Sequence, residues 1–203
     1  MILGISDYWA FVAAVLVFLA LPGPGTFALL TSTGQGGLRA GVAATLGLIA
    51  GDQVLMWLAA LGVAAVLQAN PALFQALQYA GAAYLAWLGL KLLLAREQAA
   101  APIRVLPGHY LRQAFFITLL NPKAIVFYMA FFPLFIDAGQ QRGVITFAAM
   151  AATIALLTFA YCMTLAAFAD AIGARVKAHR GAARALQRLA GVFLIGFAVR
   201  LAR

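Results

Sequence analysis

Apolar residues dominate this chain in long runs, and the charged residues gather in the short stretches between them. A helix needs about 20 apolar residues to cross the ~30 Å hydrocarbon core of a bilayer. Runs of that kind recur along nearly the whole sequence, so the pattern predicts six membrane-spanning helices. They are expected at about 8–33, 40–67, 72–94, 110–136, 144–172 and 183–201.

The sixth segment is the weakest of these. Between Arg188 and Arg200 there are only 11 uncharged residues, which would make a helix about 16 Å long. Arginine side chains at both ends can reach the membrane surface and extend such a segment. A five-span chain whose C-terminal helix lies on the membrane surface is the competing interpretation.

Two of the expected spans contain residues that interrupt a helix. The first carries PGPG at 22–25, and the fourth carries NPK at 121–123. Proline removes a backbone donor and clashes with the carbonyl one turn earlier, so each break should free carbonyls and start a new half-helix. Helix N-termini carry partial positive charge, and both breaks therefore favour an anionic group such as a carboxylate. A plain proline kink that packs neighbouring helices is the alternative.

The two halves of the chain also resemble each other. The third span contains GAAYLAWLGLK from Gly81, and the sixth contains GVFLIGFAVR from Gly191. Each is the last span of its half, and the first span of each half carries a break. Three spans is an odd number, so the second half must be inverted, as in many secondary transporters. Chance similarity between apolar segments is the alternative. The predicted fold is one all-α integral membrane domain over 1–203, with inverted three-helix repeats at about 1–95 and 110–203 and a basic loop at about 96–109.

The composition fits this class of protein: of 203 residues, 66% are hydrophobic and 9% are charged. The net charge of +9 does not indicate a nucleic-acid partner, because the basic residues lie between apolar segments, as orientation signals do. Ten of the 14 Lys and Arg residues fall in the loops after the first, third and fifth spans, and three fall on the other side. The chain is therefore expected in the cell inner membrane with both termini outside the cytoplasm. No Lys or Arg precedes the first span, so that span is not expected to be a cleaved signal peptide.

Two charges lie inside expected spans, Asp52 in the second and Lys123 in the fourth. Each costs about 2.5–3.5 kcal/mol at the bilayer centre, so neither is expected to face lipid. They could form a structural pair, or a polar site in which Asp52 binds an ammonium group or carries a proton. Gly47 and Gly51 make a GxxxG pattern, which predicts close helix packing within the chain, with a homodimer contact as the alternative.

Several other functions lack the residues they need. Cys162 is the only cysteine, so the chain is not expected to form an internal disulfide or a cysteine-based metal cluster. A thiol–disulfide carrier would need paired cysteines and is not expected either. Cys162 is also expected to lie far from both breaks. The two histidines, His109 and His179, lie in basic, polar stretches and are expected in solvent, which disfavours soft-metal export. The spans hold no Ser–His pair and no HExxH, so neither an enzyme nor a cofactor is expected. An oligomeric ion channel stays open as an alternative.

Four segments resemble the LysE/RhtB family of amino-acid exporters. They are LPGPGTFALL, GLRAGVAATLGLIAGD, GAAYLAWLGLKLL and LLNPKAIVFYMAFFPLFI, in the family's order over nearly the whole chain. The resemblance implies a six-span inner-membrane protein that exports amino acids or related small polar metabolites, driven by the proton-motive force. Many members have Asn or Asp directly after PGP where this chain has Gly25, which leaves a non-amino-acid solute as an alternative substrate. The residues expected to form the transport site are Pro22, Gly23, Pro24, Gly25, Thr26, Asp52, Asn121, Pro122 and Lys123.

Overall fold

The computed structural model describes residues 4–94, 105–136 and 143–169, together with seven positions between 188 and 199. Within these ranges the regular elements are helices, and one isolated bridge joins Ile5 to Ile136. The sixth expected span lies outside the described residues apart from those seven positions, and so does His179. His109 is exposed at the start of a helix, as expected.

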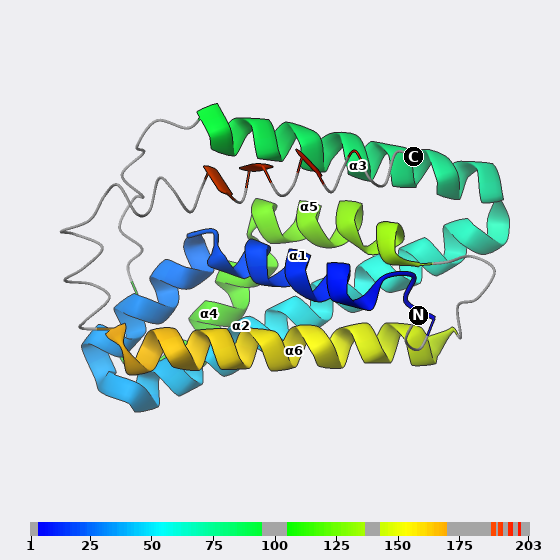
Figure 1. Cartoon of the computed structure of the whole chain (residues 1–203). Helices are drawn as coiled ribbons and strands as arrows, with labels where there is room; N and C mark the ends of the chain where they lie inside the picture. The colour runs from blue at the N-terminus through cyan, green and yellow to red at the C-terminus, as the bar shows by residue number, and fades with distance from the viewer. Residues whose placement is uncertain are drawn as a thin grey trace.

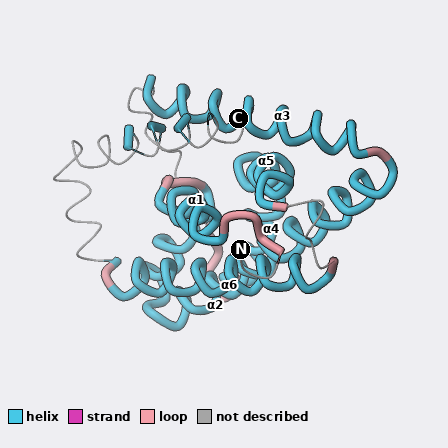
Figure 2. Tube along the Cα trace, turned by 45° about the vertical axis from the view of Figure 1, so that its right-hand side comes forward, coloured by secondary structure: helices cyan, strands magenta, loops and turns pink. Residues whose placement is uncertain are grey.

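Six α-helices and one short 3₁₀ helix follow one another within residues 4–94, 105–136 and 143–169. They are α1 (Tyr8–Ala20), α2 (Pro24–Ala69), α3 (Pro71–Leu94), α4 (Tyr110–Leu119), α5 (Pro122–Phe131), η1 (Phe132–Phe135) and α6 (Val144–Ala167). α3 and α6 lie on opposite sides of the molecule, with α1 and α5 between them (Figures 1 and 2). The short helices α1 and α5, each next to one of the breaks, therefore lie between the longer helices α3 and α6.

The longest helix, α2, joins two segments that were expected to be separate. It runs over 46 residues, but it consists of two helices joined at a kink and is not one straight helix. The helical geometry fails at Gly36 and Gly37, where Gly37 has φ +65°. Glycine adopts that conformation without a steric penalty. This kink lies between the expected spans at about 8–33 and 40–67, and the gap at 21–23 lies inside the first of them. α1 with the start of α2 therefore corresponds to the first expected span, and the part of α2 after the kink corresponds to the second.

Three parts of the described chain are suited to a bilayer. Residues Pro24–Val63 of α2 and the whole of α6 are long and apolar enough to cross one. The third part is the pair α4 and α5, which qualify together and are bent by 55° where they meet. Large apolar side chains are exposed on the outside of these helices, among them Leu58, Met129 and Leu156. Such side chains suit a surface that faces lipid.

A cluster of aromatic rings packs α1 against α5. Phe11 of α1 stacks on Phe131 of α5 at a centroid distance of 6.1 Å. Phe18 at the end of α1 stacks on Phe127 of α5 at 3.8 Å. Phe11, Phe127 and Phe131 are buried. This packing holds the C-terminal end of α1 against the first turns of α5.

Small residues bring α2 and α4 into close contact. A Cβ atom at Gly51 would lie 2.8 Å from the Cβ of Thr118, and one at Gly47 would collide with the backbone carbonyl of Leu111. Any larger residue would push the two helices apart. The predicted close packing at the GxxxG pattern is confirmed, and it lies within the chain. It also places Asp52, the next residue of α2, beside the end of α4.

Candidate functional site

The first break leaves three residues, 21–23, outside the helices. α1 ends at Ala20 and α2 begins at Pro24. The carbonyl of Phe18 would normally accept the N–H of residue 22, but that residue is a proline and has none. The Lys123 side chain supplies the missing donor. Its Nζ donates to the Phe18 carbonyl at 3.1 Å and to the Leu21 carbonyl at 2.7 Å. Its ammonium also lies 4.4 Å from the centroid of the Phe18 ring.

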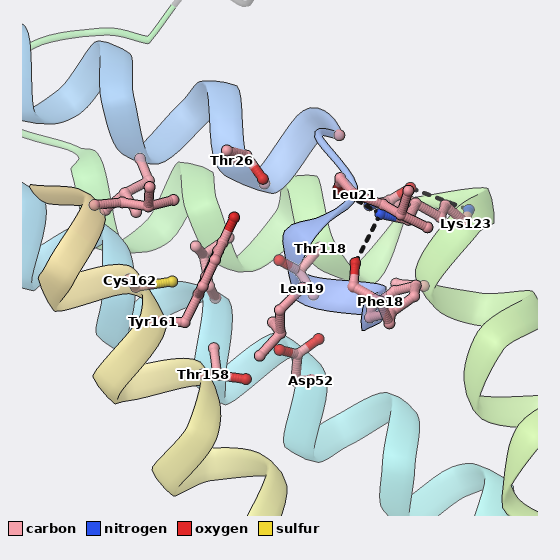
Figure 3. Close-up of a pocket in the computed structure, with 17 residues that line it drawn as sticks. Phe18, Leu19, Leu21, Thr26, Asp52, Thr118, Lys123, Thr158, Tyr161 and Cys162 are labelled. Carbon is pink, nitrogen blue, oxygen red and sulfur yellow. Dashed lines mark hydrogen bonds between the residues drawn. The ribbon is translucent and has the colours of Figure 1, made fainter. Parts of the chain in front are cut away.

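The second break is capped by its own residues. Asn121 is extended, with φ −78° and ψ 110°, and its side-chain oxygen accepts the backbone N–H of Lys123 at 3.1 Å. The backbone N–H of Asn121 donates to the Thr118 carbonyl at 3.0 Å. Pro122 follows at the first helical position, where its missing N–H costs nothing. Lys123 therefore stands in the first turn of α5, and its side chain reaches the first break (Figure 3).

Asp52 is 7% exposed and lies on α2. Its side chain is hydrogen-bonded by Tyr128 of α5 and interacts with Lys123 through space. The Lys123 ammonium, however, hydrogen-bonds backbone carbonyls rather than the carboxylate. Figure 3 shows Asp52 well apart from Lys123, with residues of the first break between them. A structural Asp52–Lys123 pair in direct contact is therefore not what the structure contains.

A cavity of about 60 Å³ lies where the two breaks, α2 and α6 meet. It has room for a few water molecules. Its wall includes six of the nine residues expected from the sequence, namely Gly23, Gly25, Thr26, Asp52, Asn121 and Lys123. The three prolines, Pro22, Pro24 and Pro122, are exposed and are not part of the wall. They shape the breaks without touching the cavity.

Residues of α6 complete the wall and were missed by the sequence argument. Thr158, Tyr161 and Cys162 face the cavity, as does Thr118 at the end of α4 (Figure 3). The expectation that Cys162 lies far from both breaks was wrong, because α6 packs against α2 and brings it to the same cavity. The spacing of positions 158, 161 and 162 places these residues on one helix face. Polar residues on a single face of an otherwise apolar span were the signal that could have found them.

The remaining wall is apolar. Phe18, Leu19, Leu29, Leu48 and Leu165 line it. The cavity thus joins a cationic end at Lys123, a carboxylate at Asp52 and an apolar surface. A zwitterion with an apolar side chain matches all three features. Among the described residues, no group of three His, Cys, Asp or Glu side chains could hold a metal ion.

Comparison with known proteins places this arrangement in context. A family model described as LysE type translocator matches residues 16–203. The chain is 38% identical to a leucine efflux protein of Enterobacter sp. (strain 638), over 98% of this chain and 96% of that protein. It is 34% identical to a leucine efflux protein of Salmonella typhimurium and 36% identical to an uncharacterized membrane protein of Pseudomonas aeruginosa, with the same coverage of both chains. No solved structure matches the chain.

Proposed function

The chain belongs to the LysE type translocator family, and from that premise we propose that it exports amino acids across the cell inner membrane as a secondary transporter. Membership of this family makes it a multi-pass membrane protein that acts as a transporter and not as an enzyme. The relatives named leucine efflux proteins support an amino acid as the cargo. The observation that carries the proposal is the cavity with a cation at one end and a carboxylate at the other.

The cationic end is suited to the carboxylate of an amino acid. An ammonium group has three N–H donors, and Lys123 uses two of them on the carbonyls of Phe18 and Leu21. The third remains for a substrate oxygen. The first turns of α2 and α5 begin at the cavity wall, near Gly25 and Asn121, and their backbone N–H groups favour a negative charge.

The opposite end is suited to the ammonium group. Asp52 is the acidic residue in the wall, and it is largely removed from water. A charged partner in such a site offsets much of the cost of the buried carboxylate. In the proposed cycle Asp52 alternately binds the substrate ammonium and a proton that moves the other way. This exchange would couple export to the proton-motive force.

The apolar wall favours an aliphatic side chain. Leu29 and Leu48 of α2 and Leu165 of α6 form a surface without charge beside the two polar ends. Burial of a leucine-sized side chain against it would contribute about 1.5–3 kcal/mol. Leucine is therefore the first substrate to test.

The proposed architecture has six spans in two inverted repeats, about 1–95 and 110–203. The first and fourth spans are the broken ones, α1 with the start of α2, and α4 with α5. The repeats would rock around the cavity and expose it to one side at a time, with both termini outside the cytoplasm. A single cysteine at Asn70 should then react with an impermeant reagent from outside, and one at Gly108 should not, in a Cys162→Ser background. Labelling of both from the same side would rule out this topology.

Transport assays test the function itself. Everted membrane vesicles containing the protein should accumulate radiolabelled leucine when a proton gradient is applied, and the rate should saturate with concentration. Asp52→Asn should abolish the gradient-driven part. Accumulation of none of the amino acids in a panel would favour the alternative of another solute on this fold. Flux that neither saturates nor responds to the gradient would favour an oligomeric channel.

A further inference from the structure

Thr158 is an unusual threonine in this structure. It is 2% exposed, and among the described residues its hydroxyl has no hydrogen-bond partner. Other helical threonines bond back to the carbonyl four residues earlier, at 2.8–2.9 Å. They are Thr33, Thr45, Thr153 and Thr164. A buried hydroxyl that makes no bond costs folding free energy, so its presence calls for a reason.

The hydroxyl of Thr158 lies in the wall of the cavity. Thr158 is on α6 and Asp52 is on α2, and Figure 3 shows the hydroxyl directed toward the Asp52 carboxylate. The two groups thus face the same part of the cavity from different helices. Both can accept hydrogen bonds, and one of them carries a negative charge. A group with one positive charge and several N–H donors would satisfy both.

We propose that Thr158 is a specificity-determining residue, whose hydroxyl accepts one N–H of the substrate α-ammonium while Asp52 accepts another. The inference rests on the proposed function and adds to it the residue that recognises the amino group. A hydroxy acid offers one O–H donor in place of three N–H donors, so when that donor bonds the Asp52 carboxylate the Thr158 hydroxyl is left unpaired and the solute binds more weakly. The site therefore distinguishes an amino acid from the corresponding hydroxy acid by more than charge alone.

Ser32 offers a matched control. Its hydroxyl is also buried and without a partner among the described residues, but it is not part of the cavity wall. Ser32→Ala and Thr158→Val each remove such a hydroxyl. Because an unpaired buried hydroxyl does not stabilise the fold, neither change should lower the melting temperature. A difference between them in transport would come from the cavity.

The test uses purified protein in proteoliposomes with leucine as the probe. Thr158→Val should raise the KM for leucine roughly tenfold or more, since a hydrogen bond to a charged group is lost. Thr158→Ser, which keeps the hydroxyl, and Ser32→Ala should retain the wild-type KM. The inhibition constant of 2-hydroxy-4-methylpentanoate, the hydroxy analogue of leucine, should change little in Thr158→Val. The variant should therefore prefer leucine over this analogue less strongly than the wild type does.

Three results would overturn the inference, and a fourth would contradict the proposed function. An unchanged KM and an unchanged preference in Thr158→Val would overturn the inference while leaving amino-acid export intact. A lower melting temperature in Thr158→Val would also overturn it, because the hydroxyl would then have a structural partner. Loss of leucine binding in Thr158→Ser as severe as in Thr158→Val would also overturn it, because a retained hydroxyl would then fail to preserve binding. Absence of leucine transport by the wild-type protein would instead contradict the proposed function.

Discussion

The two interrupted helices differ in how their backbone groups are satisfied. At the break between α4 and α5, Asn121 caps the new helix and Pro122 occupies its first position, so the hydrogen bonds are local. At the break between α1 and α2, the carbonyls of Phe18 and Leu21 are bonded by Lys123, more than 100 residues away. The first break therefore depends on the second half of the chain, whereas the second break does not depend on the first.

This difference gives Lys123 two roles. It completes the C-terminal end of α1, where a cation also interacts favourably with the helix dipole. It also presents its remaining donor to the cavity. A substrate carboxylate at this position would compete with the carbonyls for the ammonium. The residue is thus placed to link substrate binding to the geometry of the first break.

The largest effect is expected from Lys123→Met. The change leaves two carbonyls without their donor and removes the charge that interacts with Asp52 through space, so the free energy of unfolding should fall by about 3 kcal/mol. Export should be lost as well. Thermal unfolding in detergent and leucine uptake by vesicles measure the two effects. Arg112→Met removes an exposed cation from α4 and should change neither. Equal stability of Lys123→Met and wild type would mean that the first break does not depend on Lys123.

A smaller effect is expected at the second break. Asn121→Ala removes a helix cap and should lower the free energy of unfolding by about 1 kcal/mol. Asn70 caps α3 in the same way, with bonds of 2.9 Å and 3.2 Å to the N–H groups of Ala72 and Leu73, far from the cavity wall. Asn70→Ala should cost about the same stability. Only Asn121→Ala should also slow leucine uptake, and equal uptake by the two variants would contradict a role of Asn121 in the site.

The smallest effect is expected from Pro22→Ala. The change returns an N–H at the position that normally bonds the Phe18 carbonyl, which Lys123 already satisfies. Alone it should change the free energy of unfolding by less than about 1 kcal/mol. In the Lys123→Met background it should restore about 1 kcal/mol, because the new donor replaces part of what was lost. Strict additivity of the two changes in thermal unfolding would show that Pro22 and Lys123 do not act on the same carbonyl.

The sequence predicted those features that depend on local chemistry. Charges inside apolar spans pointed to Asp52 and Lys123, and glycine spacing pointed to close helix packing at Gly47 and Gly51. The structure shows that this packing is against α4. The partners of Lys123 could not be predicted, since they are backbone carbonyls in the other half of the chain. The same holds for Thr158 and Cys162, whose place at the cavity follows from how α6 packs on α2.

The central claim is that one cavity, shared by the two breaks, binds the amino acid. Cys162 is the only cysteine of the chain, lines that cavity and is 4% exposed. Alkylation of the wild-type protein by N-ethylmaleimide therefore reports on the cavity alone. Saturating leucine should slow the modification of Cys162, measured by mass spectrometry of the intact protein, and 4-methylpentanoate, which lacks the amino group, should slow it much less. An alkylation rate that is the same with and without leucine would contradict the account.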